Sequence, residues 1–202
     1  MIARVQRLSA IRDSGPERLI AFSDGVMAVI ITIMALELRP PAGTDLHDLV
    51  HRAPALLIYA LSFAIIGIYW NNHHHLLRAT ERISGAVMWS NLHLLFWLSL
   101  FPVATEWIGE EYRHAIPAAT WGVIALGSAI AYLILVRALV RVHDADSRLA
   151  VAMRGDLKGR ISESIYIAGV ALAFLPFGPW LSYACYVAVA VIWFVPDRRL
   201  AD

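Results

Sequence analysis

The residues from Arg18 to Leu38 constrain this chain most, because they form an apolar segment with a carboxylate, Asp24, just inside its start. The 19 residues from Ile20 to Leu38 would rise about 28 Å as a helix, which is close to the thickness of a bilayer's hydrocarbon core. Lipid offers a carboxylate no hydrogen-bond partner, so an ionisable group in such a segment marks a functional or anchoring site. The segment therefore predicts a membrane-spanning helix whose polar end meets other helices.

The composition agrees with an integral membrane protein. Hydrophobic residues make up 59% of the 202 residues, whereas a soluble domain is about 45–50% apolar. The charged residues, 16% of the chain, lie mostly between the apolar runs, and the single cysteine, Cys185, excludes an intrachain disulfide. We therefore expect the lipid bilayer as a partner, and no nucleic acid.

Six apolar segments predict an all-α membrane protein with one transmembrane domain over residues 1–202. The predicted spans are 18–38, 54–77, 85–108, 117–140, 161–175 and 180–195. The last two are close to the lower length limit for crossing a bilayer. A shallow re-entrant pair is therefore the alternative to a hairpin of two crossing helices.

The connections between the spans also carry expectations. Residues 1–17 are predicted to form a short lead, with Ser14 as the candidate cap and Pro16 at the start of the first helix. A polar loop is expected over 40–53, and a longer solvated connection over 141–160.

The basic residues predict the orientation in the membrane. With the N-terminus inside, 14 of the 17 Lys and Arg residues fall on the inner side, Arg4, Arg7, Arg12, Arg198 and Arg199 among them. Such a bias is typical of cytoplasmic segments. An even number of spans then places both termini in the cytoplasm of a multi-pass protein of the cell membrane.

The first span has two different faces. On a wheel of about 100° per residue, Val29, Ile33 and Leu36 share an apolar stripe, with Thr32 beside it. Such a stripe usually faces lipid or the protein core, but symmetric copies around an axis could line a pore, because hydrophobic constrictions gate by dewetting. Asp24 lies well away from the stripe, which favours an anchoring role over that of a proton or ion carrier.

Polar residues of three spans are predicted to lie at a similar depth near the cytoplasmic side. The set comprises Ser23, Asp24, Trp70, His73, His74 and Asn91. Buried polar groups are normally hydrogen-bonded, so depth alone predicts a network of Asp24, Ser23, one of the two histidines and Asn91.

The run His73-His74-His75 has three interpretations. Consecutive helical side chains point about 100° apart, so the run cannot hold one metal by itself. Structural hydrogen bonding is favoured, and a role in pH sensing is the second interpretation. The third is a haem iron held by histidines of different spans, such as His74 and His93.

Glu106, Glu110 and Glu111 lie at the outer end of the third span. Such a cluster could concentrate cations near a pore mouth. A solvated loop is the favoured interpretation.

Three motifs together resemble a known family. The pattern Arg18-x-x-x-Phe22-Ser23-Asp24 is followed by Trp70-x-x-His73, and then by Asn91-Leu92 with Pro102-x-x-Thr105. This set resembles the transmembrane protein 175 family of potassium channels. The six-span layout of the family's prokaryotic members covers nearly the whole chain.

The resemblance implies a homotetramer in which the first helix of each subunit lines the pore around the symmetry axis. It places the constriction at Val29, Ile33 and Leu36, and a threonine tied to selectivity at Thr32. The family commonly has Ile or Leu at the first of these positions, so the shorter Val29 would widen that ring and move the narrowest point to Ile33 or Leu36. Family members that conduct protons also exist.

The resulting prediction is a potassium-preferring cation channel without catalytic residues, metal or cofactor, apart from the permeant potassium ion. The predicted helix-anchoring network comprises Arg18, Phe22, Ser23, Asp24, Trp70, His73, His74 and Asn91. The alternatives are a haem-binding membrane redox protein, with histidines of the second and third spans as ligands, and a proton-coupled carrier that uses Asp24.

Overall fold

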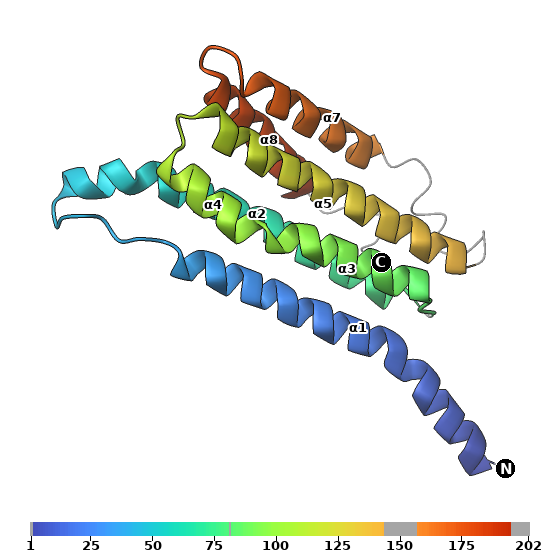
Figure 1. Ribbon diagram of the computed structural model, residues 1–202. Coiled ribbons are helices and arrows are strands. Elements are labelled where there is room, and N and C mark those ends of the chain that lie inside the picture. Colours follow the sequence, from blue (N-terminus) through green and yellow to red (C-terminus); the bar gives the residue numbers. More distant parts are fainter. Residues whose placement is uncertain (1, 81, 144–156, 195–202) are drawn as a thin grey trace.

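The computed structural model describes residues 2–80, 82–143 and 157–194, and its regular elements are α-helices (Figure 1). The helices are α1 (Ile2–Leu36), α2 (Leu46–Arg78), α3 (Gly85–Ser99), α4 (Phe101–Glu110), α5 (Ala115–Val142), α7 (Leu157–Leu172) and α8 (Gly178–Phe194). Leu100 keeps a right-handed helical backbone between α3 and α4, so these two form one span. With α3 and α4 taken as one, the prediction of an all-α membrane protein with six helices per subunit is confirmed.

Four segments are long and apolar enough to cross a membrane, namely Pro16–Leu36, Leu46–Arg78, Gly85–Glu110 and Ala115–Val142. The shorter α7 and α8 pack side by side as an antiparallel hairpin, and α7 also lies against α5. Phe177 has a φ of 58° in the turn that joins them. Residues 144–156 of the expected connection lie outside the described residues.

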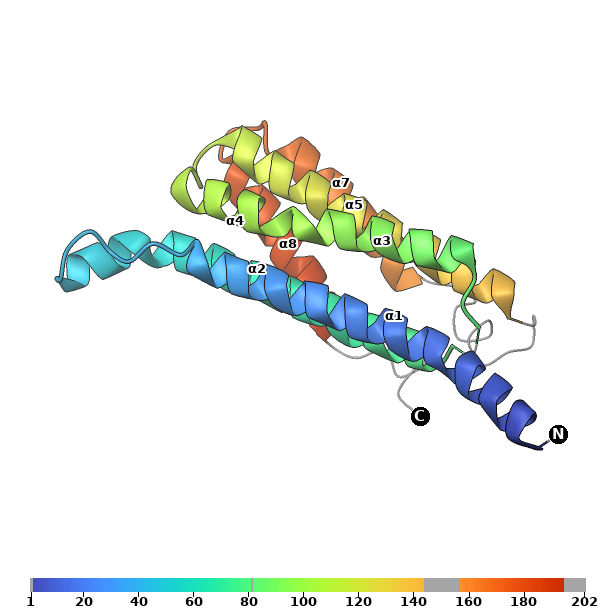
Figure 2. The ribbon, with the colours of Figure 1, turned by 60° about the horizontal axis from the view of Figure 1, so that its bottom comes forward.

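Helix α1 lies along one side of the bundle, next to α2, α3 and α4 (Figures 1 and 2). The helices α5, α7 and α8 form the opposite side. This placement covers only one face of α1 within the subunit.

The expected helix start at Pro16, after a lead over residues 1–17, is wrong, because α1 already begins at Ile2. Pro16 lies inside the helix, where it lacks an N–H donor and its ring crowds the preceding turn. The helix bends in its N-terminal part as a result (Figure 1). The side chains of Arg4, Arg7 and Arg12, and the whole of Arg198 and Arg199, lie outside the described part of the chain.

The expected loop over 40–53 is also partly wrong, because α2 begins at Leu46 and has Pro54 inside it. The backbone N–H of Asp45 donates to Oδ2 of Asp48 at 3.3 Å, which satisfies a donor at the helix start. A local cap therefore extends the helix two turns before the apolar span.

A second polar contact lies inside the bundle, where Oγ of Ser62 accepts two hydrogen bonds. The Thr105 hydroxyl donates at 2.7 Å and the Trp121 indole N–H at 3.1 Å. All three residues are buried. The contact ties α2, α4 and α5 together, and Thr105 also lies 3.9 Å from the Met34 sulfur of α1.

We expect Ser62→Ala to lower the melting temperature of the purified protein, because two buried donors then lose their shared acceptor. The expected loss in the free energy of unfolding is roughly 1 kcal/mol. This is the lower end of the range for buried hydrogen bonds in soluble proteins, because donors in an unfolded membrane protein also find partners. The control is Ser90→Ala, since the hydroxyl of the partly exposed Ser90 donates only to the carbonyl of Ala86 in its own helix. Equal melting temperatures for the two variants would contradict a bridging role of Ser62.

Candidate pore helix and its polar anchor

Helix α1 presents a buried face and an exposed face. Ser23, Met27, Ile30 and Met34 follow the helical repeat on the buried face, and each is at most 4% exposed. This face packs against the neighbouring helices α2, α3 and α4. The rotation of α1 about its axis is therefore defined within one subunit.

The predicted constriction residues lie on the exposed face. Val29 is 55% exposed, Ile33 40% and Leu36 85%. The hydroxyl of Thr32 lies among them and donates to the Val29 carbonyl at 2.8 Å. Since its hydrogen is used in the helix, the Thr32 oxygen keeps lone pairs for a cation on this face.

The buried face is held by Asn91 on α3, whose side-chain amide joins α2 to α1. Its Oδ1 accepts from Nε2 of His73 at 2.6 Å, and its Nδ2 donates to Oγ of Ser23 at 2.9 Å. Ser23 in turn donates to the Leu19 carbonyl at 2.8 Å. The structure thus brings Ser23, His73 and Asn91 together in a fully buried relay.

The relay determines which atoms carry protons. Because Oδ1 of Asn91 can only accept, His73 must carry its proton on Nε2. The reversed amide would require Ser23 to donate to Asn91, and its bond to Leu19 would be lost. Nδ1 of His73 is buried and has no hydrogen-bond partner among the described residues.

Asp24 forms a separate contact on the rim of the relay. Its Oδ1 accepts from the indole N–H of Trp70 at 2.9 Å, and its Oδ2 lies 3.7 Å from Nδ1 of His74. All three side chains are partly exposed. The carboxylate therefore connects α1 to the cytoplasmic end predicted for α2, beside the buried relay.

The anchoring role predicted for Arg18 and Phe22 is not supported by contacts within the subunit. Both side chains are exposed, on the same face as Val29, Ile33 and Leu36. Positions four and eleven residues after Arg18 return to its side of a helix, so these two residues belong to the uncovered face instead.

The opposite end of α1 is held by ion pairs. Arg39 donates to Glu106 at 3.0 Å, and Arg52 donates to Glu110 at 2.8 Å and to the Arg39 carbonyl at 3.1 Å. The favoured interpretation of the acidic cluster as a solvated loop is therefore wrong for Glu106 and Glu110, which lie in α4 and join it to α2 and to the end of α1.

Two further acidic residues lie near these ion pairs. Glu111 pairs with His114 at 2.9 Å. Partial burial, and then the charge of Glu106, raise the pKa of Glu37, which directly follows Leu36. The end of the exposed stripe thus carries a carboxylate that binds a proton more readily than a solvated one does.

The two histidines considered for haem have different partners. His74 lies beside Asp24, whereas Nε2 of His93 accepts from the indole N–H of Trp97 in the next turn of α3 at 3.0 Å. In the described ranges, no group of three or more His, Cys, Asp and Glu side chains could hold a metal.

Sequence reasoning did not identify Ser62, Trp121, Arg39 or Arg52 as contact residues. The available signal for Ser62 was a lone small polar residue within an apolar span, which is typical of helix interfaces in membranes. The arginines gave no comparable signal, because their acidic partners are 67 and 58 residues away.

Comparison with known proteins agrees with this architecture. Residues 18–102 match the family model described as endosomal/lysosomal potassium channel TMEM175. A potassium channel of Chryseobacterium sp. (strain P1-3) is 47% identical over 183 residues, which cover 91% of this chain and 94% of that protein. The chain belongs to the TMEM175 family.

A crystal structure and a vertebrate protein are also similar to this chain. The crystal structure of a lysosomal potassium-selective channel TMEM175 homolog from Chamaesiphon minutus has a TM-score of 0.76 at 27% identity, with 92% of this chain and 99% of that chain covered. The endosomal/lysosomal proton channel TMEM175 of Gallus gallus is 24% identical over 78% of this chain, which spans 33% of that longer protein. These relatives are named as channels, so the TMEM175 family member described here is a channel protein and not a redox enzyme.

We expect Asn91→Leu to lower the free energy of unfolding by roughly 1–3 kcal/mol, because His73 and Ser23 then lose their shared partner in a fully buried site. The measurement is thermal unfolding of the purified protein in detergent. Asn71→Leu is the matched control, since Asn71 is exposed on α2. If both variants unfold at the parent's temperature, the relay does not stabilise the packing of α1.

Proposed function

We propose that the chain forms a homotetrameric, potassium-preferring cation channel in the cell membrane, and that the exposed face of α1 lines its pore. The observation that carries the proposal is the exposure of Val29, Ile33 and Leu36 on a helix whose opposite face is held by the Asn91 relay. Because one face of α1 is packed within the subunit, its other face is free to meet copies of α1 from other subunits around a symmetry axis.

The chemistry of this face suits a hydrophobic constriction. Rings of Val29, Ile33 and Leu36 offer no charge and no carbonyl oxygen, so an ion that passes them must shed part of its water. Potassium holds its water less tightly than sodium does, which favours potassium at such a narrow point. The Thr32 oxygens would supply the nearest polar contact, and the shorter Val29 places the narrowest ring at Ile33 or Leu36.

The comparisons support potassium as the permeant ion, because the Chryseobacterium relative is named a potassium channel and the Chamaesiphon minutus homolog potassium-selective. Protons are the second candidate, since the Gallus gallus relative is named a proton channel. The basic residues support cytoplasmic termini. Arg137, Arg141 and Lys158 are among the described residues that this orientation places inside.

We expect the protein, reconstituted in potassium-loaded liposomes, to release potassium faster than sodium. Ile33→Asn and Leu36→Asn should each increase total flux and reduce the preference for potassium severalfold, because a polar ring admits hydrated ions. The control is Ile167→Asn, which changes an exposed apolar residue of α7, a helix packed against α5 and α8. Both ions and protons are followed in the same preparation.

Three results would contradict the proposal. They are the absence of flux from an intact oligomer, flux that neither α1 variant changes, and an equal response of the α7 control. A proton current without potassium flux would support the pore but would show that protons, and not potassium, are the permeant ion.

We expect Leu36→Cys subunits, in a Cys185→Ser background, to form disulfide-linked dimers under mild oxidation. Copies of α1 around one axis bring their Leu36 positions close, and a disulfide requires Cα atoms within about 7 Å. Denaturing gels without reductant measure the product, and Ile167→Cys in the same background is the control. Monomers only, or equal dimer from both variants, would contradict an axis beside α1.

A further inference from the structure

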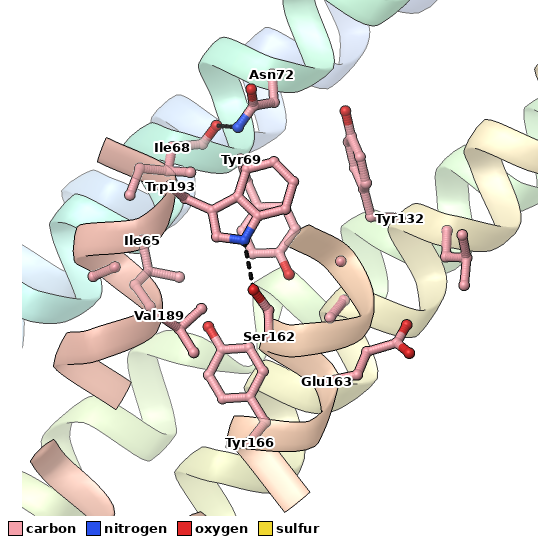
Figure 3. A pocket seen from close by; sticks show the side chains of 14 residues that line it. Ile65, Ile68, Tyr69, Asn72, Tyr132, Ser162, Glu163, Tyr166, Val189 and Trp193 are labelled. Atoms are coloured by element: carbon pink, nitrogen blue, oxygen red, sulfur yellow. Dashed lines mark hydrogen bonds between the residues drawn. The ribbon is translucent and has the colours of Figure 1, made fainter. Parts of the chain in front are cut away.

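A cavity lies between α2, α5, α7 and α8 (Figure 3), and no residue of α1 lines it. Four aromatic side chains, Tyr69, Tyr132, Tyr166 and Trp193, line it together with the carboxylate of Glu163. The pore described above uses none of these residues.

Two polar groups at this cavity have no partner in the described part of the chain. Tyr166 is only 2% exposed, its hydroxyl makes no hydrogen bond there, and in Figure 3 it points into the cavity. The Glu163 carboxylate, on a part-buried residue, likewise makes no hydrogen bond or ion pair with a described residue. Unpaired groups of this kind inside a membrane protein mark a binding site more often than a structural one.

The aromatic walls are held in place by contacts of their own. The indole N–H of Trp193 donates to Oγ of Ser162 at 2.8 Å (Figure 3), and Ser162 donates to the Lys158 carbonyl at 2.8 Å. The rings of Tyr69 and Tyr132 meet edge to face with centroids 6.0 Å apart. The cavity is therefore preformed, which lowers the entropic cost of binding.

The protein itself shows which chemistry these rings attract. The ammonium group of Lys158 lies 5.7 Å from the centre of the Trp193 ring, a cation–π distance. Lys158 is not among the residues that line the cavity. An ammonium thus already contacts Trp193, while the cavity presents further rings and an acidic group.

We propose that this cavity binds a small organic ammonium compound, free or as the headgroup of a lipid. Glu163 supplies the opposite charge, the aromatic rings surround the alkylated nitrogen, and the Tyr166 hydroxyl donates to an oxygen of the ligand. Several aromatic rings around one site form the kind of cage that recognises quaternary ammonium groups by cation–π contacts.

Other ligand classes fit this lining less well. An apolar molecule would leave Glu163 and Tyr166 without partners. A divalent metal needs several oxygen ligands, whereas the lining has one carboxylate. An anion would be repelled by that carboxylate.

The test is the binding of labelled choline to the full-length protein in detergent, compared with its neutral carbon isostere dimethylbutanol. We expect saturable choline binding and none of the isostere. Glu163→Gln should weaken the binding about tenfold and Tyr166→Phe about threefold, as expected for the loss of a charge pair and of a hydrogen bond. Glu111→Gln removes a carboxylate far along the chain, beside His114, and should leave the binding unchanged.

Several results would overturn the proposal: no choline binding, equal binding of the isostere, or equal affinity in the Glu163 variant and the Glu111 control. Melting temperatures of all variants verify that each is folded. Repeating the measurement in phosphatidylglycerol and phosphatidylethanolamine bilayers identifies the source of the ligand. Weaker choline binding only in the latter supports a lipid headgroup, and equal binding in both supports a free ammonium compound.

Discussion

The structure depends on one constraint: a polar side chain buried within a bilayer must be paired with another protein group. Asn91 meets this constraint for two neighbours at once, because its amide accepts from His73 of α2 and donates to Ser23 of α1. An apolar or charged side chain could not do both. The relay therefore determines how α1 is turned about its axis, and so which residues of α1 stay uncovered.

Three kinds of contact hold α1 against the neighbouring helices at three positions along its length. The Asn91 relay holds Ser23 in the first half of the span, Met34 packs beside Thr105 near the C-terminal end of α1, and Arg39 pairs with Glu106 just beyond that end. These contacts all come from α2, α3 and α4, whereas the cavity lies between α2, α5, α7 and α8. Helix α2 contacts both regions, because Tyr69 lines the cavity and the adjacent Trp70 donates to Asp24 of α1.

Much of the fold followed from local properties of the sequence. The six helices were predicted from apolar runs, because a segment that crosses a bilayer must be both apolar and long enough. The helix starts at Ile2 and Leu46 were missed, since Pro16 and Pro54 suggested boundaries that the structure accommodates inside longer helices. The ion pairs of Glu106 and Glu110 were missed because nothing local indicates a partner about sixty residues away.

The sequence by itself determined the membrane-spanning character of the chain and the stripe of Val29, Ile33 and Leu36, since hydropathy and the helical repeat are local quantities. Only the tertiary structure decided which polar residues meet. It separated Ser23, His73 and Asn91, which are buried together, from Arg18 and Phe22, which share the exposed face. The physical reason is that pairing depends on how neighbouring helices are turned and at what depth they lie, and distant segments of the chain set both.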